Sequence, residues 1–142
     1  MPRQFGFTSE ERYEMLTGIA QDIAVNVALA EGTPRGSYAS YPSLAGGAEI
    51  DLNSDSVSKP LGRLRRVMVS AAVPVRVAVK SVVSGVPTTR GVFFAFPGRA
   101  YDFVPESSIS VGSGDWFRAT IKNLEDSVAS DVYVTFVWEE FD

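Results

Sequence analysis

The chain has 142 residues, 13 basic and 17 acidic side chains, a formal net charge of −4, and neither cysteine nor histidine. Without cysteine it has no disulfides, zinc–thiolate sites or thiol nucleophiles, and without histidine it lacks the commonest general base and transition-metal ligand. The negative charge argues against general nucleic-acid binding, which depends on a strong positive field. We therefore expect a non-enzymatic protein without a cofactor, with 45% hydrophobic residues to build one core.

The first periodic segment covers residues 8–30, where a helix is predicted. Thr8 and Glu11 match the capping-box pattern, in which each side chain satisfies a free backbone donor. Apolar residues then recur at three- and four-residue spacing, and Gly32 and Pro34 predict the end of the helix. No signal-peptide pattern and no apolar run of about 18 residues is found, so we expect no membrane partner.

Residues 32–62 are rich in Gly, Ser, Pro and Tyr, and only residues 48–52 have a strand-like pattern. An irregular stretch of this length is unusual inside a compact domain. It predicts an extended arm, which together with the helix makes an N-terminal region of residues 1–62 that lies on another surface. Tyr38 and Tyr41 would then be interface residues, because a free arm offers them little to pack against.

Residues 63–142 are predicted to form an antiparallel β-sandwich of the jelly-roll type. Apolar and polar residues alternate with period two, and turn signals recur about every ten residues. Pro74 cannot donate to a strand ladder, so it predicts a bend between two strands. The expected strands cover residues 67–73, 75–80, 92–96, 101–104, 108–111, 116–122 and 132–140.

One short segment resembles the beginning of a calcium loop. Asp51, Asn53 and Asp55 present oxygen ligands at alternate positions, as a hard cation requires. The sixth position is Ser56 and not glycine, and the twelfth is Gly62 and not glutamate. A polar turn that caps itself with side-chain hydrogen bonds is the favoured interpretation.

The basic cluster consists of Arg63, Arg65 and Arg66, with Lys59 nearby. Arginine suits phosphate or carboxylate, so one interpretation is an interface. The favoured alternative is a solvated entrance to the first strand of the domain. If the cluster binds a partner, an acidic protein surface is expected in preference to DNA, because the chain itself is negatively charged.

The carboxylates that acid–base chemistry would use lie near the C-terminus; they are Glu125, Asp126, Asp131, Glu139, Glu140 and Asp142. A glycosidase needs two carboxylates at a defined separation, and no spacing here indicates such a pair. A charged, solubilising C-terminus is the simpler interpretation of residues 139–142. A jelly-roll enzyme working through Glu106, Asp115 or Glu139 stays open as a third hypothesis.

Two tryptophans have different expected roles. Trp138 is in phase with Phe136 and Val134, which predicts a place in the core. Trp116 follows a glycine-rich turn and alternates with Arg118, so both are expected at an interface or, with the tyrosines, on a sugar-stacking platform.

The valine-rich β domain, the N-terminal helix and arm, and the closing segment GDWFRATIKNLEDSVASDVYVTFVWEEFD resemble small virion structural proteins of tailed bacteriophages. These include head decoration proteins, head or tail accessory proteins and fibre-type jelly rolls. The resemblance implies a protein that oligomerises, with a trimer favoured, and docks on a capsid or tail. It also implies a place in the virion after assembly in the host cytoplasm. The alternative function is a carbohydrate-binding β-sandwich module.

Overall fold

Long runs of alternating valine and polar residues give this chain its strands, because β-branched side chains fit a pleated surface with one buried face. The computed structural model describes residues 32–142, which contain nine strands. They are β1 (Thr33–Leu44), β2 (Glu49–Asn53), β3 (Leu61–Ala71), β4 (Val75–Val83), β5 (Val86–Ala95), β6 (Tyr101–Phe103), β7 (Ser110–Val111), β8 (Trp116–Asn123) and β9 (Ser130–Phe141). No helix in this part of the chain is long and apolar enough to cross a membrane.

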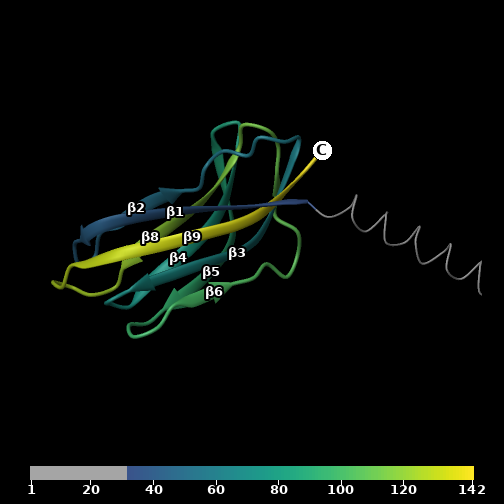
Figure 1. Cartoon of the computed structure of the whole chain (residues 1–142). Helices are drawn as coiled ribbons and strands as arrows, with labels where there is room; N and C mark the ends of the chain where they lie inside the picture. The colour runs from purple at the N-terminus through teal and green to yellow at the C-terminus, as the bar shows by residue number, and fades with distance from the viewer. Residues whose placement is uncertain (1–31) are drawn as a thin grey trace, which may run out of the picture. The chain divides into compact units, whose positions relative to one another are not determined.

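The strands form two antiparallel sheets (Figure 1). One has the order β1-β9-β3-β6, with β7 also paired to β3, and the other has the order β2-β8-β4-β5. The consecutive strands β3 and β4 belong to different sheets, and Pro74 lies in the short connection between them. The prediction of a mainly β protein with two antiparallel sheets is confirmed.

The core lies between the inner faces of the two sheets. Strand β9 contributes four apolar residues that are 0% exposed, Val132, Val134, Phe136 and Trp138. Strands β4 and β8 contribute Val75, Val77, Val79, Phe117, Ala119 and Ile121. The ring centroids of Phe117 and Trp138 are 6.1 Å apart, so the largest core side chains of the two sheets meet. This confirms the core position predicted for Trp138.

The structure corrects the predicted arm, because residues 33–62 are part of the sandwich. Strand β1 pairs with β9 from Thr33 to Leu44, and β2 pairs with β8 along its whole length. Val57, in the connection between β2 and β3, is 1% exposed. It packs so closely on Gly62 that a Cβ added at Gly62 would lie 2.5 Å from Val57 Cγ2. Residues 33–142 form one compact unit, so the predicted boundary at residue 62 is wrong.

The physical reason is that β1 and β2 lie at sheet edges. An edge strand tolerates glycine and serine, and it tolerates proline where the missing N–H would face solvent. Composition therefore predicted irregular chain where a neighbouring strand supplies the order. The helix predicted at residues 8–30 lies outside the described residues.

Candidate functional site

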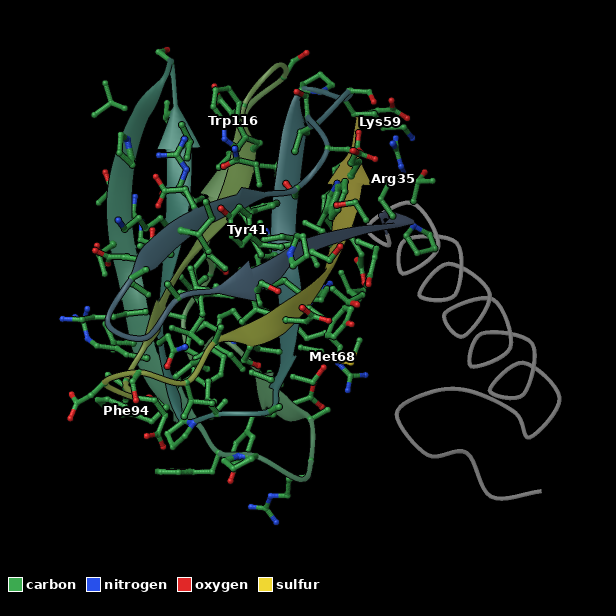
Figure 2. All side chains as sticks on the ribbon, turned by 90° about the vertical axis from the view of Figure 1, so that its left-hand side faces the viewer. Arg35, Tyr41, Lys59, Met68, Phe94 and Trp116 are labelled. Atoms are coloured by element: carbon green, nitrogen blue, oxygen red, sulfur yellow. The ribbon has the colours of Figure 1, made fainter. Side chains whose placement is uncertain are left out.

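The free edge of β5 carries an exposed apolar row. Strand β5 pairs with β4 and forms one end of its sheet. Val92 and Phe94 are 42% and 50% exposed, and Phe96, just after the strand, is 52% exposed. Figure 2 shows Phe94 at the corner of the sandwich opposite Arg35 and Lys59. Singly exposed apolar residues are ordinary, whereas an apolar row along an open strand edge is the kind of surface to which another chain can pair.

The same strand is anchored firmly from its inner side. Phe93 points the other way from Val92 and Phe94 and stacks on Phe103 of β6, with ring centroids 5.6 Å apart. At Gly91 an added Cβ would lie 2.6 Å from the Phe103 ring. The inner side of β5 is therefore packed against β6 through an aromatic pair, while Val92 and Phe94 point away from that contact.

The first half of β5 differs from the second. The hairpin turn from β4 uses two residues with positive φ, Ser84 at 52° and Gly85 at 80°, the backbone of a tight two-residue hairpin. A register shift then occurs opposite Val79 and Lys80, and the guanidinium Nε of Arg90 donates to Ser81 Oγ at 3.0 Å. Beyond this bulge, residues 91–95 pair regularly with β4 and carry no charge.

A second exposed surface lies on the outer face of the other sheet. Tyr38 of β1 and Tyr133 of β9 are 63% and 41% exposed, and their rings stack with centroids 6.3 Å apart. The hydroxyl of Tyr133 donates to Asp131 at 3.4 Å, and the nearby negative charge of Asp131 raises the pKa of Tyr133. Next to the rings lie two open hollows of about 350 and 620 Å³, which share Ser70, Ala100 and Tyr133 as lining residues.

The two tyrosines predicted from the sequence do not act together. Tyr38 lies opposite Thr135 of β9, whereas Tyr41 lies opposite the buried Val132. The odd spacing of positions 38 and 41 turns their side chains to opposite faces of the strand. Tyr133, which the sequence reasoning missed, is the aromatic partner of Tyr38.

The predicted arginine cluster is present on β3, but two of its members are paired within the protein. Arg65 donates to Glu139 Oε2 at 2.7 Å, which raises the pKa of Arg65, and Arg66 forms an ion pair with Asp102. Arg63 lies over the ring of Phe141, 5.2 Å from its centroid. The acidic partners of this cluster are thus in the same chain.

Trp116 and Arg118 meet two of the three predicted calcium ligands, Asp51 and Asn53, on the outer face of the second sheet. The third, Asp55, lies beyond β2, and its backbone N–H donates to Ser37 Oγ of β1. The side-chain oxygen of Asn53 accepts hydrogen bonds from Trp116 Nε1 at 3.2 Å and Arg118 Nε at 2.8 Å. Asp51 accepts from Thr120 at 2.7 Å. Asp51 and Asn53 lie on strand β2, and residues 32–142 contain no group of three acidic side chains placed to hold a metal ion.

Glu140 contradicts the prediction of a solvated C-terminus, because it is only 1% exposed. Its Oε1 accepts from the backbone N–H groups of Ser58 and Lys59 at 2.8 and 2.9 Å. Its Oε2 accepts from Trp138 Nε1 at 3.0 Å and forms an ion pair with Arg35 at 3.1 Å. Burial alone would raise the pKa of Glu140, but these donors outweigh it and the pKa is lowered. The carboxylate is fully occupied in tying β1 and the β2–β3 connection to β9.

No family model and no curated protein matches the sequence. Among solved structures, the chain is similar to a de novo designed double-stranded β-helix, with 17% identity, 72% of this chain and 97% of that chain covered, and a TM-score of 0.35. It is similar to a subunit of the disulfide-linked pili of Bacillus endospore appendages, with 14% identity, coverage of 79% and 92%, and a TM-score of 0.42. It is also similar to a carbohydrate-binding module of family 36 in complex with calcium and xylotriose, with 17% identity, coverage of 76% and 93%, and a TM-score of 0.37.

Proposed function

We propose that this protein is a non-enzymatic assembly protein that joins other protein subunits through the free edge of β5. The observation that carries the proposal is the row Val92, Phe94 and Phe96, exposed by 42%, 50% and 52%, on and just after a strand whose second edge is not paired within the described residues. Proteins usually protect such edges with charges, proline or short strands, because unpaired backbone groups and apolar side chains attract another chain. The uncharged edge of residues 91–95 is therefore suited to pairing with another protein chain.

In its specific form, the proposal is a virion component of a tailed bacteriophage, either a capsid decoration protein or a head or tail accessory protein. The sequence resemblance to such proteins supports it. The surface proposed for assembly differs from the one expected from the sequence. Residues 33–62, which were expected to form a docking arm, belong to the sandwich, so the β5 edge takes their place in the proposal as the surface that contacts the shell or a neighbouring subunit.

The proposal is tested by measuring the solution mass of the full chain by light scattering from micromolar to millimolar concentration. We expect the mass to rise with concentration, and Phe94→Ser to suppress the rise. Val104→Ser is the matched control, since Val104 is 64% exposed but lies outside β5. A wild-type chain that stays monomeric over the whole range, with no change in Phe94→Ser, would overturn the proposal.

A carbohydrate-binding module is the second candidate, and the stacked pair Tyr38 and Tyr133 favours it. Exposed aromatic rings offer flat apolar surfaces, and polar groups such as Ser70 and Asp131 line the adjoining hollows. In affinity electrophoresis through gels containing polysaccharides, we expect Tyr38→Ala to lose retardation. Tyr41→Ala is the control because its side chain faces the other way. Failure of the wild-type chain to be retarded in any gel would remove this candidate.

A further inference from the structure

The free edge of β5 is distinguished from the other sheet edges of the described residues. Strand β1 carries Pro34 and Pro42, and β2 has five residues that include two acidic ones, Glu49 and Asp51. Strand β6, at the remaining end, has three residues. Proline, charge and short length are the features by which edges avoid pairing; β5 as a whole has ten residues, and its second half has neither proline nor charge.

Residues 91–95 of β5 form an edge that is complementary to itself. In an antiparallel pair about a two-fold axis at Phe93, residue 92 of one copy faces residue 94 of the other. Val92 then lies beside Phe94 of a second copy twice, on the exposed face, and Gly91 faces Ala95. The register places no two like charges opposite each other, because all five residues are uncharged.

The ends of this segment limit the register. The bulge at Arg90 interrupts the strand on one side, and β5 ends at Ala95 on the other. A two-fold axis at Phe94 would place Pro97 opposite Gly91, where proline has no N–H to donate. Pairing about Phe93 uses the regular segment from end to end.

We infer that β5 pairs with β5 of a second copy of this chain, antiparallel and with Phe93 at the two-fold axis, so that two four-stranded sheets become one continuous sheet. The inference rests on the proposed assembly function and specifies its contact. A symmetric pair is isologous, so it joins two copies and stops there. Further growth into a larger assembly then needs another surface.

The absence of cysteine from the sequence makes the register directly measurable, because each introduced cysteine is the sole thiol of its chain. Directly opposed residues on neighbouring strands have Cβ atoms about 4.5–5.5 Å apart, close to the separation of a disulfide, whereas diagonal neighbours are about 7–8 Å apart. We would mix ¹⁵N-labelled Val92→Cys protein with unlabelled Phe94→Cys protein and add oxidised glutathione. Mass spectrometry separates mixed dimers from the two kinds of like dimer.

The expected result is that mixed dimers form at least ten times faster than dimers of Val92→Cys alone or Phe94→Cys alone. Val104→Cys mixed with Phe94→Cys is the control for random collision. Faster formation of Phe94→Cys like dimers would overturn this register in favour of an axis at Phe94. Absence of cross-links faster than the control, while Phe94→Ser still abolishes the concentration-dependent mass, would overturn β5 self-pairing and leave the assembly function standing.

Discussion

Glu140→Gln tests whether the buried carboxylate holds the edge of the first sheet. Glutamine has the same size, but it replaces one acceptor oxygen with a donor that faces donors. Hydrogen bonds to charged groups contribute about 1.5–3 kcal/mol each, and removing one member of a buried ion pair costs about 3–5 kcal/mol. Because Arg35 is 38% exposed, its share is reduced by solvent screening. We expect a loss of about 3–5 kcal/mol, which is about 10–20 °C in melting temperature for a domain of this size.

The assay is urea unfolding followed by tryptophan fluorescence in a Trp116→Phe background, which leaves Trp138 as the reporter beside the carboxylate. Arg35→Ala in the same background should cost about 1 kcal/mol or less, because three donors to Glu140 remain. A loss of under 1 kcal/mol for Glu140→Gln would refute the argument that this carboxylate organises β1, β9 and the β2–β3 connection.

The same residue gives a pH dependence with a definite sign. The pKa of Glu140 is lower in the folded chain than its ordinary value of 4.5, so the unfolded chain binds the proton more tightly. The carboxylate therefore stabilises the fold fully above the unfolded pKa, and this stabilisation is lost as the pH falls through the folded pKa. In acid titrations followed by fluorescence, the free-energy difference between wild type and Glu140→Gln should shrink below about pH 4.5. A constant difference from pH 7 to pH 3 would contradict this account.

Four further substitutions probe packing and charge by urea unfolding. Gly46→Ala should lower the free energy of unfolding by about 2 kcal/mol or more, because the added Cβ would lie 2.6 Å from the backbone of Asp126. Gly36→Ala is the control and should be neutral or slightly stabilising, because its Cβ would lie 3.6 Å from the nearest atom. Equal effects of the two substitutions would contradict the close approach at Gly46. Gly91→Ala should cost about 1–3 kcal/mol by displacing the Phe103 ring, and an unchanged midpoint would show that the ring can move freely. Arg65→Ala should change stability by about 1 kcal/mol at most, since its ion pair with Glu139 is solvent-exposed, and a larger loss would assign that pair a structural role.

Period-two alternation was sufficient to predict the strands that face the core on one side. It located β3, β4, β8 and β9 and put Trp138 inside, because each of these strands turns alternate residues to the core along most of its length. The same alternation places Glu140 on the buried face of β9, because Glu140 is in phase with Trp138 and Phe136. The charge suggested a solvated end, but the periodicity indicated the buried face.

The features that the sequence did not predict depend on residues that lie together in the fold but far apart in the sequence. Strand β1 was predicted as an arm because of its Gly, Ser, Pro and Tyr content, and the strand with which it pairs, β9, lies about 100 residues later in the sequence. The strand expected at residues 92–96 missed the first half of β5, which contains Pro87, a residue that an edge strand accepts. The stacking of Tyr38 on Tyr133 follows from the register of β1 and β9, which neither local pattern contains.

The register of β1 on β9 is itself specified by few contacts. Strand β1 brings little apolar surface to the core, so hydrophobic burial alone defines the register weakly. A slip by one residue would turn every side chain of β1 to the opposite face. Tyr38 would then leave Tyr133, and Arg35 would leave Glu140. The half-buried ion pair of Arg35 with Glu140 and the exposed tyrosine stack, one on each face of the strand, therefore favour the observed register together. The sugar-binding candidate and the stability of the first sheet's edge consequently depend on the same strand, β1, whereas the β5 edge belongs to the second sheet.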